Sequence, residues 1–191
     1  MKRNPTDALI VVDIQSDFCP GGALPVNGGD AIVPVVNALS TRFDTVVFTR
    51  DWHPAAHCSF SAAPQFMDKS WPAHCVAGSS GAAFHPDLRV PANALVVSKG
   101  TDAAREAYSG FQGTTLAEDL EKRGVSRVFV CGLATDYCVK HTAIDAVRAG
   151  FETVVLEDAI RAVDVPPGAG AAAMDEMKQA GIAFVQSGDL P

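Results

Sequence analysis

Short runs of apolar, mostly β-branched residues recur along the chain and predict five or six β-strands. Each run is nearly continuous in its hydrophobicity instead of alternating with polar residues. This pattern is typical of strands that are buried on both faces of a parallel sheet. The predicted strands cover residues 8–13, 45–49, 94–98, 127–131, 153–156 and 182–186.

Helical periodicity occupies the intervals between these runs. Apolar residues spaced by three or four positions begin near residues 32, 115, 139 and 169, and each set lies on one helix face. The second helix starts with Thr115 and Glu118, which have capping-box spacing, and Gly124 follows it where a C-terminal cap belongs. Strand alternating with helix predicts an α/β fold, a three-layer doubly wound domain with a mainly parallel central sheet, over residues 1–191.

One long stretch interrupts this alternation. Residues 52–91 contain five prolines, both tryptophans and four of the five histidines. A long irregular excursion in a compact domain is usually functional. We therefore expect this segment to build part of a site.

Composition narrows the class of protein. A hydrophobic content of 48% with 19% charged residues is typical of a globular chain. The net charge of -7 argues against nucleic acid and anionic membrane as partners. The apolar run near the N-terminus has only five residues, so neither an export signal nor a membrane span is expected. The five cysteines are then expected to be reduced thiols in a cytoplasmic protein.

Reactive polar side chains occur at the ends of four predicted strands. Asp13 ends the first strand, Asp51 follows the second, Lys99 ends the third and Cys138 comes just after the fourth. In open α/β sheets, ligands bind beyond the carboxyl ends of the strands. We therefore expect these four side chains to meet at one edge of the sheet.

Cys138 is a candidate nucleophile. It lies where a tight turn enters a helix, and the positive end of the helix dipole favours a thiolate there. Asp13 could serve as a general base with a raised pKa, and Lys99 as its counter-charge. Each residue also has a structural alternative: Cys138 could be a buried structural cysteine, Asp13 a strand-end cap and Lys99 an exposed lysine. No single residue therefore decides between a catalytic and a structural role.

Asp51 and His53 are candidate metal ligands. They are two residues apart, so in an extended segment both side chains project to the same side. His74 could supply a third ligand, and such a set suits Zn, Fe or Mn as a divalent ion. A structural zinc site made by the two His-Cys pairs at 57–58 and 74–75 is the weaker alternative, because adjacent side chains point apart.

Taken together, the motifs resemble those of a known family. The chain is similar to the nicotinamidase/pyrazinamidase branch of the isochorismatase-like cysteine hydrolases, in order from about Ala8 to Asp158. The matching segments are VDIQSDF at 12–18, TRDWHP at 49–54, SWPAHC at 70–75, SKG at 98–100 and CGLATDYCV at 131–139.

The resemblance implies roles for individual residues. It implies a catalytic triad, an oxyanion hole made by the backbone N–H groups of Ala134 and Cys138, and a cis peptide bond between Leu133 and Ala134. It leaves the fourth metal ligand open between His57 and Ser59. The implied triad is Asp13, Lys99 and Cys138, the implied metal ligands are Asp51, His53 and His74, and the implied ring pocket is Phe18, Trp71 and Tyr108.

The activity implied by the resemblance is hydrolysis of nicotinamide, and of pyrazinamide, to the acid and ammonia through a Cys thioester, in NAD salvage. An amidohydrolase acting on a carbamoyl or ureido substrate is the nearest alternative. A non-haem iron oxygenase would also use two histidines and one carboxylate, but the α/β alternation disfavours it. A binding domain without catalysis would have a broken triad. The sequence leaves open whether copies of the chain form a homo-oligomer.

Overall fold

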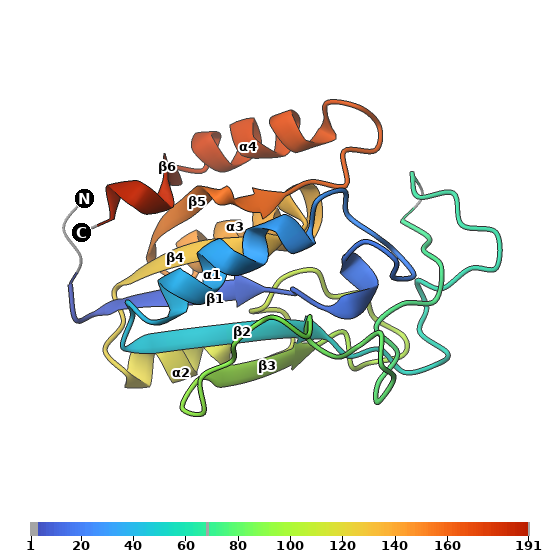
Figure 1. Cartoon of the computed structure of the whole chain (residues 1–191), viewed down its shortest axis with the longest axis horizontal. Helices are drawn as coiled ribbons and strands as arrows, with labels where there is room; N and C mark the ends of the chain where they lie inside the picture. Colours follow the sequence, from blue (N-terminus) through green and yellow to red (C-terminus); the bar gives the residue numbers. More distant parts are fainter. Residues whose placement is uncertain (1–3, 68, 191) are drawn as a thin grey trace.

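Figure 1 shows the computed structural model, which describes residues 4–67 and 69–190. One sheet contains six strands in the order β3-β2-β1-β4-β5-β6, and every neighbouring pair is parallel. The α/β fold with a parallel sheet is thus confirmed. The strands are β1 (Asp7–Val12), β2 (Thr45–Asp51), β3 (Leu95–Lys99), β4 (Arg127–Leu133), β5 (Glu152–Arg161) and β6 (Ala183–Val185).

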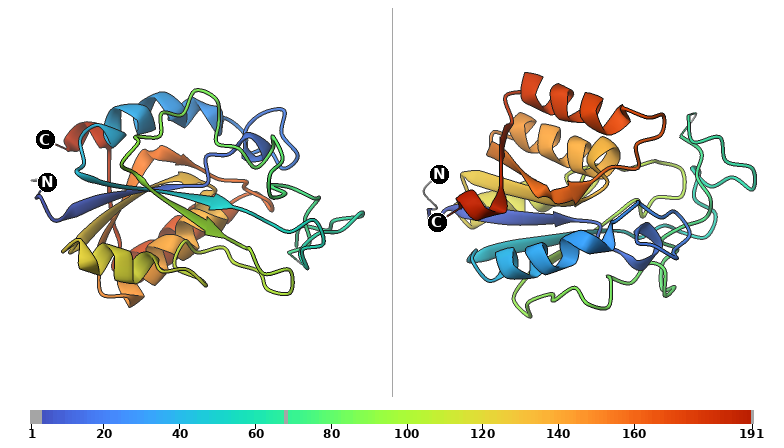
Figure 2. Two further views of the ribbon diagram at one scale, coloured as in Figure 1. Left: turned by 90° about the horizontal axis from the view of Figure 1, so that it is seen from below. Right: turned by 45° about the horizontal axis from the view of Figure 1, so that its top comes forward.

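Helices cover both faces of the sheet and complete three layers (Figure 2). On one face, α1 packs with the C-terminal segment around Leu9, Val11 and Phe129. On the other face, three helices pack around Ile10 and Val12, which are the alternate residues of β1. The helices are α1 (Val33–Ser40), α2 (Leu116–Lys122), α3 (Lys140–Arg148) and α4 (Ala169–Gln179), with short turns η1 (Ser16–Phe18), η2 (Asp30–Ile32), η3 (Thr135–Val139) and η4 (Ser187–Asp189).

The predicted capping box at the start of α2 is wrong. Thr115 lies at the N-cap but has φ −96° and ψ 14°, and its side chain makes no cap hydrogen bond. A capping residue needs an extended backbone to turn its oxygen toward the helix N–H groups. Instead, the Thr115 hydroxyl donates to Asp119 Oδ2 at 2.8 Å.

The long excursion between β2 and β3 lies at the carboxyl end of the sheet, on the right of Figure 1. Among its described residues it forms only isolated bridges, such as His53 with Val76 and Phe60 with Trp71. No helix within the described residues is long and apolar enough to cross a membrane.

The pairing of the two central strands at Gly132 leaves no room for a side chain. This residue pairs with Val12 across β4 and β1 and has φ +117°. A Cβ atom at position 132 would lie 2.1 Å from the Val12 carbonyl oxygen. Only glycine fits at this position. The pairing holds β1, which leads into Asp13, beside β4, which leads into the η3 turn.

Candidate active site

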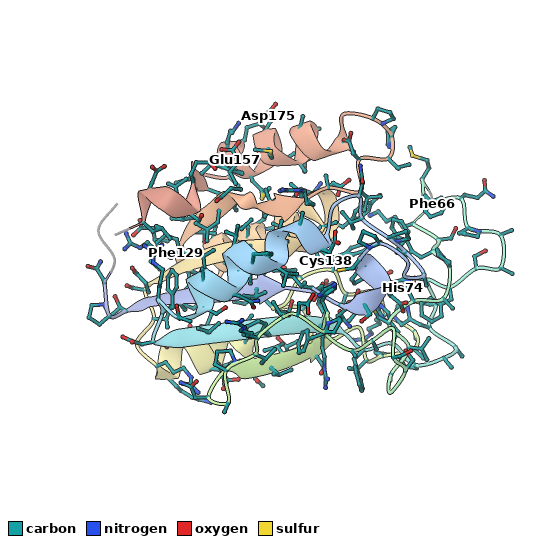
Figure 3. The ribbon with its side chains drawn as sticks, in the orientation of Figure 1. Phe66, His74, Phe129, Cys138, Glu157 and Asp175 are labelled. Atoms are coloured by element: carbon teal, nitrogen blue, oxygen red, sulfur yellow. The ribbon has the colours of Figure 1, made fainter. Side chains whose placement is uncertain are left out.

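The order of the strands creates a topological switch point between β1 and β4. From β1 the chain proceeds outward to β2 and β3, and then returns to the other side of β1 as β4. Ligands bind at such a point in open α/β sheets, beyond the carboxyl ends of the strands. Asp13 follows β1 and Cys138 follows β4, so the two lie on either side of the switch point. Figure 3 labels Cys138 and His74 at this end of the sheet.

Asp13 is wholly buried at the end of β1, where its backbone turns with φ 47°. Its Oδ1 accepts a hydrogen bond of 2.7 Å from the Thr49 hydroxyl, and its Oδ2 lies 2.9 Å from Lys99 Nζ. Burial raises the pKa of Asp13 above its usual value, whereas the Lys99 charge lowers it; the net direction is upward. A carboxyl group in this state can accept a proton from a neighbour.

Lys99 connects the acidic groups of the site. Its buried ammonium forms ion pairs with Asp13 and Asp51 and donates to the Ala107 carbonyl at 3.2 Å. It also lies 3.4 Å from Cys138 Sγ. Burial alone would lower the pKa of Lys99, but the two carboxylates raise it well above its usual value. Lys99 therefore remains charged, contrary to the alternative of an exposed strand-end lysine.

Cys138 lies in the η3 turn, which α3 continues, and the peptide bond between Leu133 and Ala134 is cis, as the resemblance implies. Burial raises the pKa of the Cys138 thiol well above its usual value, and Lys99 only partly opposes this. The carboxylates of Asp13 and Asp51 raise it further. Desolvation and the two anions therefore oppose the thiolate that we expected from the helix start, and this environment favours the thiol form of Cys138.

Asp51, His53 and His74 come together as a candidate metal site. One ligand atom from each lies within 4.8 Å of the others, and all three residues are buried. His53 Nδ1 bonds to the Gly100 carbonyl at 2.9 Å and His74 Nδ1 to the Pro72 carbonyl at 2.8 Å. A carbonyl can only accept, so each Nδ1 carries a proton, and Nε2 is the ring nitrogen left to bind an ion. The residues therefore fit a divalent ion.

His57 is placed differently from the other two histidines. Its Nε2 bonds to the Arg105 carbonyl at 3.0 Å, and its Nδ1 to the Ser59 hydroxyl at 2.8 Å. Nε2 thus carries the proton, and Nδ1 accepts from Ser59, so both nitrogens are already engaged. Its ring lies against that of His53, with centroids 4.2 Å apart.

The alternative of a structural zinc site made by His-Cys pairs is not supported. Cys58 is exposed and Cys75 is buried. Within residues 4–67 and 69–190, neither of them belongs to a group of potential metal ligands. All five cysteines are free.

A pocket lies in front of the Cys138 thiol, and the three side chains expected to bind a ring all line it. Trp71 Nε1 donates to the Tyr108 hydroxyl at 3.1 Å, which fixes these two rings relative to each other. Ala134 also lines the pocket. The lining residues are Phe18, Leu24, Val26, Asp51, Trp71, His74, Glu106, Tyr108, Ala134, Tyr137, Cys138 and Val163.

The sequence analysis missed several of these lining residues. Tyr137 precedes the nucleophile and packs edge-on against Trp71, with centroids 5.0 Å apart. Its position next to Cys138 was a signal that could have identified it. Val163 lies in the loop after β5 and had no such signal. Asp136 positions this loop, because its carboxylate accepts the N–H groups of Val163 and Asp164, both at 2.9 Å.

Comparisons with known proteins agree with this geometry. The Isochorismatase domain family matches residues 7–189. A nicotinamidase/pyrazinamidase from Mycobacterium tuberculosis is 44% identical, over 94% of this chain and 98% of that protein.

Two solved structures are also similar. A pyrazinamidase of Pyrococcus horikoshii in complex with zinc is 47% identical, covers 95% of this chain and 99% of its own, and has a TM-score of 0.86. A protein from L. infantum in complex with nicotinate is 41% identical, covers 100% of this chain and 98% of its own, and has a TM-score of 0.89. The chain therefore belongs to the isochorismatase family, within its nicotinamidase and pyrazinamidase branch.

Proposed function

We propose that this protein is a nicotinamidase, which hydrolyses nicotinamide, and also pyrazinamide, to the acid and ammonia. One observation carries the proposal: Cys138 of a buried Cys-Lys-Asp cluster lines the same aromatic pocket as Asp51 and His74 of a three-ligand metal group. Relatives that are 40–44% identical are nicotinamidases. The activity would serve NAD salvage, in the cytoplasm.

Asp13 is the proposed general base of the first half-reaction. It takes the proton of the Cys138 thiol, and its raised pKa suits a group that must alternately accept and release a proton. The sulfur then attacks the carboxamide carbon, and the C=O electron pair moves onto oxygen. The backbone N–H groups of Ala134 and Cys138 bind this oxyanion. Lys99, charged throughout, stabilises the negative charge that passes between Asp13 and Cys138.

Collapse of the tetrahedral intermediate breaks the C–N bond. Asp13 returns its proton to the leaving nitrogen, so ammonia departs and a thioester to Cys138 remains. In the second half-reaction Asp13 takes a proton from water, and the hydroxide oxygen attacks the thioester carbon. The C–S bond then breaks, the sulfur recovers its proton and the acid is released.

Asp51, His53 and His74 would hold a divalent ion, for which Zn, Fe and Mn are candidates. When bound, the ion would act as a Lewis acid that anchors the pyridine nitrogen of the substrate. Either Ser59 or His57 would complete the ligand set, and these two side chains bond to each other through the Ser59 hydroxyl and His57 Nδ1. Phe18, Trp71 and Tyr108 would enclose the ring.

The experiment that tests the function is ammonia release from nicotinamide by the purified protein supplied with Zn, Fe or Mn. Steady release of ammonia and nicotinate is expected. If nicotinamide were inert with every metal while a carbamoyl or ureido compound released ammonia, the proposal would be replaced by the alternative amidohydrolase.

A further inference from the structure

The segment that follows β1 carries polar side chains for which the proposed mechanism has no use. Asp13 is the proposed base, but Gln15 and Asp17 belong to the same motif and are not among the residues that line the pocket. Gln15 is completely buried, and the Asp17 carboxylate accepts the backbone N–H groups of Ala23 and Cys75. A buried side-chain amide requires partners for its oxygen and for both of its hydrogens.

The Gln15 amide bonds to both backbone polar groups of Asp51. Its Oε1 accepts the Asp51 N–H at 2.7 Å, and its Nε2 donates to the Asp51 carbonyl at 2.8 Å. The second Nε2 hydrogen goes to the Ala82 carbonyl at 2.9 Å. Both donors of the amide are thus used, and two of its three bonds fix a single residue.

The path of β1 explains why Asp51 needs this partner. Pairing between β1 and β2 ends at Val11 and Phe48, and the last backbone bond runs from the Asp13 N–H to the Thr49 carbonyl at 3.2 Å. Asp13 then turns away with φ 47°, so no strand residue lies beside Asp51 on that side. The primary amide of Gln15 supplies one donor and one acceptor, as a neighbouring strand would.

Asp17 fixes the segment of another candidate ligand. Its Oδ2 accepts the Cys75 N–H at 2.7 Å, and Cys75 directly follows His74. The Cys75 carbonyl in turn accepts the His53 N–H at 3.0 Å. Gly81 leaves no spare room around this carboxylate, since a Cβ atom there would lie 2.1 Å from Asp17 Oδ2.

We propose that Gln15 and Asp17 are positioning residues for the metal-ligand group. Gln15 sets the backbone of Asp51, and Asp17 sets the segment that carries His74 and supports His53. One short segment after β1 thus supplies the base and fixes the ligands, which couples their relative positions. This inference rests on the proposed function for the role of the metal, but the placement of the ligands can be tested by metal binding alone.

The test is zinc titration of the chelator-stripped protein by calorimetry, for the wild type and for Gln15→Met, Gln15→Asn, Asp17→Asn and Asp17→Glu. Met matches the length of Gln without its hydrogen bonds, and Asn keeps the amide but is one methylene too short. Glu retains the charge of Asp17 but misplaces it against Gly81. Loss of such supporting hydrogen bonds typically weakens metal affinity by roughly tenfold to a hundredfold.

The control is Asp7→Asn. Asp7 makes a buried ion pair with Arg127 at the opposite end of β1, with a distance of 2.7 Å between Asp7 Oδ2 and Arg127 Nη2. This variant loses stability without touching the ligands, so its zinc affinity should match the wild type. Weaker zinc binding in the soluble Gln15 and Asp17 variants, with Asp7→Asn unchanged, supports the proposal. Wild-type affinity in either Gln15 variant or in both Asp17 variants would overturn it. Ammonia release by the wild type is measured separately, so a failure of the proposed function would be distinguished from a failure of the positioning role of Gln15 and Asp17.

Discussion

The ammonium of Lys99 lies 2.9 Å from the carboxylate of Asp13, and both side chains are wholly removed from solvent. Breaking a buried pair by removing one partner typically costs about 3–5 kcal/mol, since a charge is left without compensation. The pair therefore has consequences for stability as well as for catalysis.

We expect Lys99→Met to abolish turnover and to destabilise the protein in a pH-dependent way. Burial already raises the Asp13 pKa above 3.8, and loss of the Lys99 charge raises it further. Between 3.8 and this raised pKa the folded state binds more protons than the unfolded state, so stability falls as pH rises. The difference in unfolding free energy from the wild type should thus be large at neutral pH and shrink toward pH 4. Urea unfolding at several pH values measures it.

Lys140→Met is the matched control for that experiment. Lys140 pairs with Glu176 at 2.9 Å, but its side chain is 17% exposed and that of Glu176 is 55% exposed. Such a pair contributes at most about 1 kcal/mol, with little dependence on pH in this range. An equal effect of both substitutions at every pH would contradict the role given to Lys99.

Cys138→Ala should abolish ammonia release while the fold is retained. The substitution removes one sulfur atom from a packed turn and removes the only proposed nucleophile. Cys131→Ala is the control, because Cys131 is equally buried in β4 but does not line the pocket. It should keep most of its activity. Retention of more than about one per cent of wild-type turnover by Cys138→Ala would refute the assignment of the nucleophile.

Brief labelling with iodoacetamide at neutral pH should modify Cys58 before Cys138. Cys58 is exposed, whereas burial raises the pKa of the Cys138 thiol, and alkylation requires the thiolate. Labelling of Cys138 should accelerate as pH rises, because the thiolate fraction increases. Peptide mass mapping gives both rates. Preferential labelling of Cys138 at neutral pH would show that the helix dipole prevails over burial.

Removal of the metal should affect two substrates differently. If the ion anchors the pyridine nitrogen, nicotinamide turnover falls steeply after chelation through weaker binding and misplacement. Benzamide lacks that nitrogen, so it should be a poor substrate whose residual turnover depends little on metal. Ammonia release from both substrates, with holo and chelated enzyme, makes the comparison. Equal metal dependence would instead indicate that the ion activates the attacking water.

Asp136→Asn should weaken substrate binding more than it slows the chemical step. The amide offers one acceptor for two N–H groups, so Val163 is released from the pocket wall. We expect KM for nicotinamide to rise roughly tenfold, which corresponds to about 1.4 kcal/mol. Asp164→Asn is the control, because that side chain caps the start of α4 through Gly168 and Gly170 and does not line the pocket. Equal KM changes in both variants would contradict the role given to Asp136 in positioning Val163.

Much of the fold and the grouping of the candidate site followed from sequence for a simple reason. Continuous apolar runs marked the buried strands, and a parallel sheet brings all carboxyl ends to one edge. Asp13, Asp51 and Lys99 were therefore brought together without knowledge of any contact. The capping box failed because Thr115 has the required side chain but not the required backbone.

What escaped sequence analysis depends on tertiary contacts. The Gln15 amide bonds to backbone groups, which carry no residue-type signal, and the backbone of Val163, which lines the pocket, is held by the Asp136 carboxylate. The protonation state of Cys138 depends on its burial and on two carboxylates from other strands. The position of Cys138 at a helix start could reveal neither its burial nor the nearby carboxylates.

The contact between Gly132 and Val12 also sets how much change this protein can tolerate. Any side chain at position 132 would wedge β4 away from β1 and so separate the nucleophile from its base. The damage would arise far from solvent and without contact to a substrate. In a saturation mutagenesis screen scored by activity, position 132 should therefore be as intolerant as position 138. Such a screen alone would not distinguish Cys138, which reacts with the substrate, from Gly132, which is needed because it has no side chain between two paired strands.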